Sequence, residues 1–504
     1  MRITLSAILC LLFLNTTFAQ QFHVSLTEPT QTDFGFSALA APNGGYIGID
    51  RTAKNTGGLN WNRFRFTITA KLYDKDMKMI KENKLSDGNN VYSGFYSAFK
   101  KIGDTYWLIY VESAEKSNIG NVMAVSIDPV TLATGTPKLL AAAGSMELSL
   151  PMVDGMSKLT FQFVVSPDQK HSLLLVGASK EQFYLARLDE QLNVVWGRKE
   201  SIAGITDHNI QSSVIDNNGN IYLSYTEYIK NAPNMGHIMI FKKTGAPVNK
   251  TVSLNGTLKE VKLLASKKGD LIYIAGTFFE ETENLAGAYK ASMTTADFKL
   301  STVRRSAFTD SLVDQFAKDS WGNTKAKKYG LYPQFNAELI ESGDGIVNLV
   351  AEFRTQVSGT RAVFYISGSI LVVSFGNTTT SFARIPKTRT SAGSTIGDSY
   401  AFISAQDKII IFYNDVEKNI SRDINLTPVG SDVYTNAVLV AAIIDRDGLV
   451  KREKVLDLKQ KDFLAIGDRM NMLAPAVVQF PVYKIKNLGG IGNDMMLATV
   501  TIDQ

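Results

Sequence analysis

The sequence predicts an all-β fold, a single β-propeller built from four-stranded antiparallel blades, on the basis of three observations. A tight turn followed by an apolar, β-branched or aromatic run recurs eight times along the 504 residues. A second type of reversal, with an Asp at its start, recurs inside several of these units. The units are spaced roughly 50 to 75 residues apart, which is the period expected of a propeller blade rather than of a helical repeat.

The eight repeated turns each carry Gly, Asn or Asp, and each leads into a run that indicates a strand buried on both faces. They are "PNGGYIGI" from 42, "IGDTYWLIYV" from 102, "PDQKHSLLLVG" from 167, "DNNGNIYLSY" from 216, "KKGDLIYIAG" from 267, "SGDGIVNLVAEF" from 342, "AQDKIIIFY" from 405 and "IGNDMMLATV" from 491. Short strands such as "GFSALA" and "FQFVVS" precede most of them. This pattern favours eight blades, with seven as the alternative.

The Asp-type reversal is clearest in "YLARLDEQLNVVW", residues 184 to 196. Similar stretches are "TAKLYDKDMKMIK" from 69 and "LVAAIIDRDGLVK" from 439. An Asp side chain can accept hydrogen bonds from the amides of its own turn, which favours a reversal. We therefore interpret Asp74, Asp189 and Asp445 as turn formers in the hairpin that joins the third and fourth strands of a blade.

Two segments depart from the repeat. "QFHVSLTEP", from residue 21, predicts a lone strand before the first blade, and the last unit is one strand short, so this strand is expected to complete the last blade and close the ring. "FTDSLVDQFAKDSWGNTKAK", residues 308 to 327, has apolar residues at helical spacing, a start at Thr309 or Asp310 and an end at Gly322. It predicts a short helix between blades five and six, which either packs on the ring or covers one end of the central channel.

The first nineteen residues, "MRITLSAILCLLFLNTTFA", have the positive start, short apolar run and small final residues of a secretory signal peptide. The predicted mature domain is therefore residues 20–504, exported to the periplasm, the extracellular space or the cell surface. Cys10 is the only cysteine and lies in the signal, which excludes thiolate metal sites and Fe–S clusters from the mature chain. No cofactor or metal site is predicted, and no transmembrane segment. The net charge of +5 does not indicate nucleic-acid binding.

Long loops are predicted between the second and third strands of the blades, all on one face of the ring. Loops on one face of a repeat fold are where binding residues usually gather. Four aromatic residues are placed in these loops by the sequence pattern, and aromatics among polar loop residues suit contacts with a peptide or glycan. The candidate binding residues are Trp61, Tyr228, Phe278 and Tyr413.

Catalysis has weaker support in the sequence. The four histidines show no paired metal-ligand spacing, and no Ser–His–Asp pattern is present. Two carboxylates from distant loops could still meet for glycoside hydrolysis. The acids near the predicted face are Asp50, Glu112, Glu227, Glu280 and Asp415. "FARIPKT", from 382, has the Arg-Ile-Pro of sialidases, but the Ser-x-Asp-x-Gly-x-x-Trp box of that family is missing.

The signal peptide, the "ARLDEQLNVVW"-type hairpins, the helical insert before "GDGIVNLVAEFR" and the closing strand together resemble uncharacterised exported β-propeller proteins of Bacteroidota. The resemblance implies the fold and an envelope location, and it brings no catalytic residues. Two functions follow as expectations. The first is a non-catalytic binding or scaffold protein that engages an envelope protein, peptide or glycan through the long-loop face. The alternative is a glycan-active hydrolase or lyase that uses loop carboxylates.

Overall fold

The computed structural model describes most of the predicted mature chain. The described residues are 22–31, 34–55, 64–85, 92–113, 120–142, 161–179, 182–201, 210–227, 234–254, 256–280, 284–319, 331, 335–358, 363–392, 400–405, 407–430, 437–458, 463–467, 470–485 and 491–503. The predicted signal peptide lies outside them. Among these residues, no helix combines the length and apolar character that crossing a bilayer requires.

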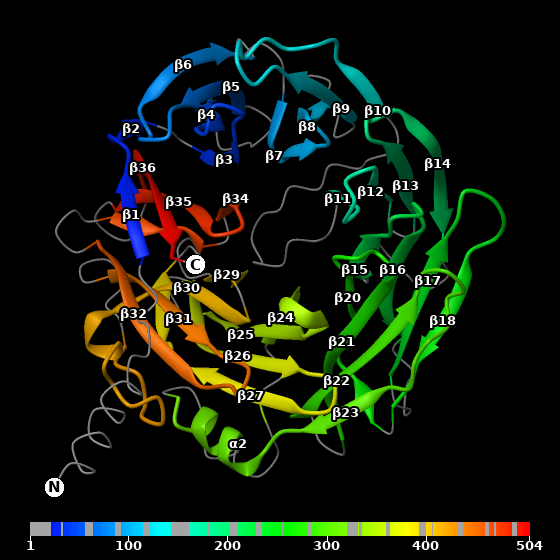
Figure 1. Cartoon of the computed structure of the whole chain (residues 1–504), viewed down its shortest axis with the longest axis vertical. Coiled ribbons are helices and arrows are strands. Elements are labelled where there is room, and N and C mark those ends of the chain that lie inside the picture. The colour runs from blue at the N-terminus through cyan, green and yellow to red at the C-terminus, as the bar shows by residue number, and fades with distance from the viewer. Residues whose placement is uncertain are drawn as a thin grey trace, which may run out of the picture.

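The described strands form eight antiparallel sheets, which are the blades of a propeller and follow one another in chain order around a ring (Figure 1). The prediction of eight four-stranded blades is therefore confirmed. Blade 1 consists of β3 (Phe34–Ala40), β4 (Tyr46–Asn55), β5 (Phe64–Tyr73) and β6 (Met79–Lys84), and blade 2 of β7 (Tyr92–Ile102), β8 (Thr105–Ser113), β9 (Gly120–Ile127) and β10 (Lys138–Ala141). Blade 3 consists of β11 (Phe161–Val165), β12 (His171–Ser179), β13 (Gln182–Asp189) and β14 (Val194–Ser201), and blade 4 of β15 (Ile210–Ile215), β16 (Ile221–Glu227), β17 (Met235–Phe241) and β18 (Val248–Val252).

Blades 5, 6 and 8 carry additional short strands, whereas blade 7 has four strands. Blade 5 consists of β19 (Thr257–Leu258), β20 (Lys262–Ala265), β21 (Leu271–Phe279), β22 (Leu285–Thr294) and β23 (Arg304–Ala307), and blade 6 of β24 (Phe335–Glu341), β25 (Val347–Ser358), β26 (Val363–Phe375), β27 (Thr380–Ile385) and β28 (Arg389–Ala392). Blade 7 consists of β29 (Tyr400–Ala405), β30 (Lys408–Val416), β31 (Ala437–Ile444) and β32 (Val450–Asp457). Blade 8 consists of β33 (Phe463–Ala465), β34 (Asn471–Ala474), β35 (Val477–Ile485) and β36 (Ile491–Ile502), and β1 (Phe22–Leu26) and β2 (Thr30–Gln31) complete it. Two 3-10 turns, η3 (Gly343–Gly345) and η4 (Glu417–Asn419), follow strands β24 and β30.

The hydrophobic core is divided into eight clusters, and each cluster lies between two neighbouring blades. One cluster, for example, joins Ile47 and Leu72 of blade 1 to Leu108 of blade 2. Another joins Tyr73 of blade 1 to Leu497 of blade 8, so the last blade packs on the first. Because both faces of each blade are covered in this way, the central strands carry continuous apolar runs rather than an alternating pattern.

The N-terminal strand closes the ring, as predicted. Strand β1 pairs antiparallel with β36 in a continuous register from Phe22 opposite Ile502 to Leu26 opposite Ala498. Phe22, Val24 and Leu26 pack on the core between blades 7 and 8, whereas His23 and Ser25 are exposed. The outermost strand of the last blade therefore comes from the start of the chain, and the two ends of the propeller are held by one sheet (Figure 1).

The Asp-type turns are confirmed as the hairpins between third and fourth strands. In blade 3, Asp189 Oδ1 accepts hydrogen bonds from the amides of Gln191 at 3.0 Å and Asn193 at 2.7 Å. Asp74 and Asp445 make the same pair of bonds in blades 1 and 7. These bonds hold the third residue after the Asp in the left-handed region, with φ 59° at Leu192, a conformation that is unfavourable for a residue with a Cβ.

Seven of the eight predicted turns join the first and second strands of a blade, and the eighth, in the unit whose strand order the sequence leaves open, does not. "IGNDMMLATV" leads into β36, the third strand of blade 8, rather than its second strand. The first hairpin of blade 8 lies instead at Pro475 and Ala476, between β34 and β35. This turn has no Gly, Asn or Asp, so the residue types used to find the other hairpins do not reveal it.

The predicted helix is α2 (Asp310–Ala317), between blades 5 and 6. Thr309 caps it, since its Oγ1 accepts a hydrogen bond from Leu312 N at 3.2 Å. The helix ends at Ala317, before the predicted end at Gly322, which lies outside the described residues. Its buried side chains join the core between blades 5 and 6, and it lies at the outer edge of the ring. Of its two predicted roles, the structure therefore shows packing on the ring, and α2 does not cover the channel (Figure 1).

Candidate functional site

The first strand of each blade lies nearest the axis of the ring (Figure 1). These inner strands form the wall of the region around the axis, which is here called the central channel. Two cavities lie along this wall. The first, here called the lower cavity, is lined by β11, β15, β20 and β24 of blades 3 to 6. The second, the upper cavity, is lined by β34, β3, β7 and β11 of blades 8, 1, 2 and 3, and by the first turn of blade 3. Phe163 and Val164 line both cavities, which therefore meet at β11.

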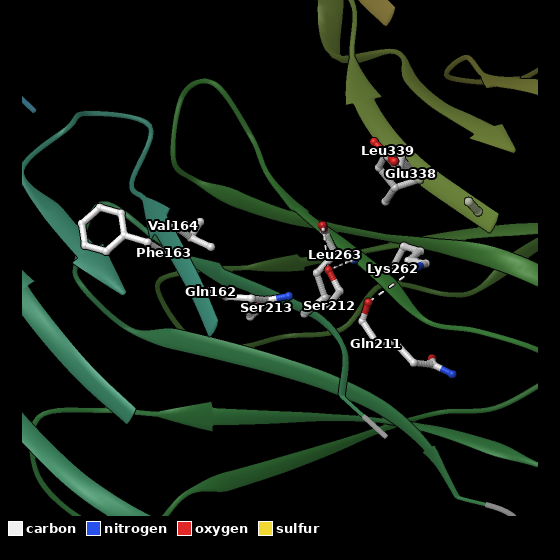
Figure 2. Close-up of a pocket in the computed structure, with 11 residues that line it drawn as sticks. Gln162, Phe163, Val164, Gln211, Ser212, Ser213, Lys262, Leu263, Glu338 and Leu339 are labelled. Carbon is white, nitrogen blue, oxygen red and sulfur yellow. Dashed lines mark hydrogen bonds between the residues drawn. The ribbon is translucent and has the colours of Figure 1, made fainter. Parts of the chain in front are cut away.

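The lower cavity has a volume of about 440 Å³ and a largely polar wall. Figure 2 shows Gln162 and Phe163 on one side and Glu338 and Leu339 on the other. Glu338 is exposed and Lys262 is half-buried, so one charge of each sign reaches this part of the channel.

Much of that polar wall holds neighbouring blades together. The Ser213 hydroxyl of blade 4 donates to Gln162 Oε1 of blade 3. Gln211 Oε1 accepts from Val261 N at 2.7 Å. Ser212 Oγ accepts from Leu263 N at 3.1 Å (Figure 2), and both bonds join blade 4 to blade 5. These polar groups are already hydrogen-bonded within the protein, so displacing them would cost free energy.

The upper cavity is larger, about 600 Å³, and carries two lysines but no acid among its described lining residues. Eight of its twelve lining residues are apolar, two adjacent lysines on β7 add charge, and polar and apolar atoms share the exposed wall about equally. The lining residues are Leu39, Ala40, Lys100, Lys101, Phe163, Val164, Val165, Ser166, Pro167, Gln169, Met472 and Leu473. Among these, Met472 has 52% of its surface exposed. A cavity of this size lined mainly by apolar side chains, with a few polar groups, is typical of ligand sites in proteins.

Among the described residues that line the upper cavity, Lys100 and Lys101 are the charged ones. Lys101 Nζ lies 5.7 Å from the ring centre of Tyr106, whose hydroxyl donates to the carbonyl of Ala40 in blade 1. Lys100 is open to the channel, yet the strands around it desolvate its ammonium group, and this burial lowers its pKa. An anion in the cavity would stabilise both ammonium groups.

Two of the four predicted aromatic residues lie within the described residues, and they belong to different blades. Trp61 and Tyr228 lie outside the described residues. Phe278 and Tyr413 were expected in loops, and this placement is wrong: they lie in β21 and β30, with 0% and 1% of their surface exposed. Both strands run further than their apolar pattern indicates, because their last residues still pack between blades. The binding role of the four aromatics stays a prediction.

The five acids considered for catalysis line neither of the two cavities. Asp50 is buried beside Lys71, with 3.0 Å between Oδ2 and Nζ. Glu227 lies 3.0 Å from the imidazole Nε2 of His237, and Glu280 forms an ion pair with Arg305. In the part of the chain that the structure describes, no three His, Cys, Asp or Glu side chains are grouped so as to hold a metal ion.

The long loop after β30 is described as far as residue 430, and this part packs on the ring. Asn419 is fully buried; its Oδ1 accepts from Val429 N at 2.8 Å, and its Nδ2 donates to Asp415 Oδ1 at 2.7 Å. Arg384 of blade 6 donates to the carbonyl of Ile424 at 2.6 Å. The loop therefore fastens blade 7 to blade 6.

Asp415 anchors this loop from a buried position. Its Oδ1 also accepts from Val416 N at 2.7 Å, whereas Oδ2 has no hydrogen-bond partner among the described residues. Burial raises the pKa of Asp415 to about 6, although its hydrogen bonds and the charges of Arg452 and Lys387 act in the opposite direction. The folded protein thus binds a proton at Asp415 more tightly than the unfolded chain does.

We expect Asp415→Asn to remove part of the pH dependence of stability. Because the folded-state pKa is raised, the contribution of Asp415 is present below about pH 4 and is lost as pH rises to about 6. Asparagine keeps an acceptor at the Oδ1 position and carries no charge. Denaturant unfolding between pH 4 and pH 7 should show the wild type losing up to about 3 kcal/mol relative to the variant. If the unfolding free energy changed with pH by the same amount in the two proteins, this account would be contradicted.

Comparisons with known proteins add the following similarities. No protein-family model matches the chain, and no curated protein sequence matches it. Among solved structures, the β-propeller domain of the Trilobed protease from Pyrococcus furiosus is 10% identical, with 87% of this chain and 97% of that chain covered and a TM-score of 0.38.

Two other solved structures show comparable similarity. A protein of unknown function from Dyadobacter fermentans is 11% identical over 95% of this chain and 99% of that chain, with a TM-score of 0.33. The polysaccharide lyase Uly1 is 10% identical over 81% of this chain and 90% of that chain, with a TM-score of 0.40. The assignment of the propeller fold rests on the strand pairing described above.

Proposed function

We propose that this chain is an exported, non-catalytic binding protein of the periplasm or cell surface, which engages a protein segment, peptide or glycan in its central channel. The observation that carries the proposal is the pair of adjoining cavities, about 440 and 600 Å³, which share Phe163 and Val164. The signal-like start of the chain supports export. This site differs from the long-loop face that the sequence predicts, because the upper cavity includes a short first-hairpin turn at the opposite end of the blades.

The channel suits binding better than carboxylate catalysis. Glu338 is the one acid among the described residues that line the two cavities, and glycoside hydrolysis by the common mechanisms uses a pair of carboxyl groups. A glycan-active hydrolase or lyase remains the alternative function, and it would need carboxylates from elsewhere in the chain.

Filling the upper cavity is expected to abolish ligand binding. Purified residues 20–504 are screened on peptide and glycan arrays, and each ligand found is measured again with Met472→Trp. The bulkier ring occupies the cavity, so affinity should fall by at least about tenfold. Leu139→Trp is the matched control, since Leu139 is also 52% exposed but lies on the outer strand β10.

The two variants together show whether the ligand binds in the channel or on the outer surface of the ring. Loss of binding in Leu139→Trp alone would place the site on the outer surface and contradict the proposal. Equal binding by both variants, or the absence of any ligand on both arrays, would also contradict it. Release of products from a bound glycan would support the catalytic alternative.

A further inference from the structure

We propose that the upper cavity binds the C-terminal carboxylate of a peptide that ends in an apolar residue, with Lys100 and Lys101 as the residues that recognise the carboxylate. This inference rests on the proposed function and specifies its ligand. Three features of the cavity support it: the position of its two cations, the character of its walls and the free edges of its strands.

The two cations reach the cavity from both faces of one strand. Successive side chains of a strand point to opposite faces of its sheet, so Lys100 and Lys101 flank the inner edge of β7. On the side of blade 1, the ammonium group of Lys101 lies near the ring of Tyr106, which is hydrogen-bonded to the Ala40 carbonyl. A carboxylate at this edge would lie between two ammonium groups.

No carboxylate among the lining residues neutralises these lysines. Asp104 and Asp168 belong to the turns that follow the lining strands β7 and β11, and neither lines the cavity. Asp168 is already an acceptor for the Ser166 hydroxyl at 2.6 Å and for Lys170 N at 3.1 Å. The lowered pKa of Lys100 has burial as its cause, which is the effect that a bound anion would offset.

Most of the other side chains in the wall suit contact with an apolar side chain better than with a sugar. Eight of its residues are apolar: Leu39, Ala40, Phe163, Val164, Val165, Pro167, Met472 and Leu473. Ser166 has the one hydroxyl among the described lining residues. It is used within its own turn, where its Oγ also accepts a hydrogen bond from His171 N at 3.0 Å. The many hydroxyl groups of an acidic glycan would lose hydrogen bonds to water here and find few side-chain partners in exchange.

The strands around the cavity also offer backbone groups to a peptide. Among the described strands, β3, β7 and β11 each end their sheets, so one edge of each has no neighbouring strand. An unpaired strand edge presents N–H and C=O groups that an extended peptide can pair with. A fatty acid carries a carboxylate and an apolar chain but has no amides to make this pairing.

The test uses fluorescein-labelled pentapeptides that end in leucine, with either a free carboxylate or a C-terminal amide, and measures binding by fluorescence polarisation. We expect the free acid to bind residues 20–504 at least about tenfold more tightly than the amide. Lys100→Met and Lys101→Met should each weaken binding of the free acid and remove most of the difference from the amide. Affinity should also fall as salt is raised, because the recognition is ionic.

Three controls make the result specific. Lys100→Arg keeps the charge and should retain most of the affinity, whereas Lys81→Met removes an exposed lysine from the outer strand β6 and should change nothing. Octanoate and an oligogalacturonate test the other sources of a carboxylate. Tight binding of either one in place of the peptide would overturn the assignment to a peptide.

Failure of this inference can be told from failure of the proposed function. If Met472→Trp abolishes binding of an array ligand while the lysine variants and the amide bind normally, the channel proposal stands and carboxylate recognition is wrong. If the free-acid peptide does not bind the wild type, carboxylate recognition is overturned, and the array ligands alone decide the proposed function.

Discussion

Lys387→Met should destabilise the protein by about 3–5 kcal/mol, a very large effect for one side chain. Lys387 lies between β27 and β28 of blade 6, and its Nζ forms an ion pair with Glu352 Oε1 of β25. The exposed fractions of the two side chains are 1% and 0%. Removal of the lysine leaves a buried carboxylate with less compensation, and such a charge is costly in a low-dielectric interior.

The double variant Glu352→Gln with Lys387→Met is the matched control. It removes both charges, so it should recover much of the lost free energy of unfolding in urea. Arg354, which lies 2.5 Å from Glu352 Oε2, is partly exposed and can be solvated without its partner. A loss below about 1 kcal/mol in the single variant would show that Arg354 alone neutralises Glu352.

Disruption of strand β1 should open the ring. Replacement of Phe22, Val24 and Leu26 by serine removes the apolar face that covers the core between blades 7 and 8. Three partly buried side chains of this size contribute about 3 kcal/mol or more. The edge of β36 would then be exposed, and an unpaired edge favours association, so size-exclusion chromatography should show oligomers alongside a lower unfolding midpoint.

The opposite face of the same strand provides the control. His23→Ala with Ser25→Ala changes two exposed residues and keeps the backbone pairing with β36. This variant should unfold within about 0.5 kcal/mol of the wild type. Equal stability of the triple-serine variant and this control would mean that β1 does not hold the ring closed.

The fold could be predicted to a large extent from the sequence because turn chemistry is local. Asp189 accepts two amide hydrogen bonds within its own turn, and the turn before Tyr46 is rich in Gly. In both cases, residues within a few positions of the turn are enough to predict the hairpin. The first hairpin of blade 8 could not be predicted because Pro475 and Ala476 do not have this chemistry. Phe278 and Tyr413 were placed in loops because strands buried on both faces have no alternation that marks where they end.

The candidate site could not be predicted in the same way. The wall of the upper cavity combines Leu39, Lys100, Phe163 and Met472 from four blades, and ring closure alone brings them together. Lys100 and Lys101 follow an apolar residue near the end of a strand, where lysines usually face solvent. No spacing in the sequence distinguishes such a lysine from one that faces a channel.

Protection of a single thiol tests the central claim, ligand binding in the channel, most directly. Residues 20–504 contain no cysteine, so Met472→Cys and Leu139→Cys each introduce one thiol at a position that is 52% exposed. The rate of modification by a maleimide is measured with and without the array ligand that binds most tightly. We predict that the ligand slows modification at position 472 by at least about tenfold and leaves position 139 unchanged. Unchanged modification at 472 together with protection at 139 would contradict the account and place the ligand on the outer surface of the ring.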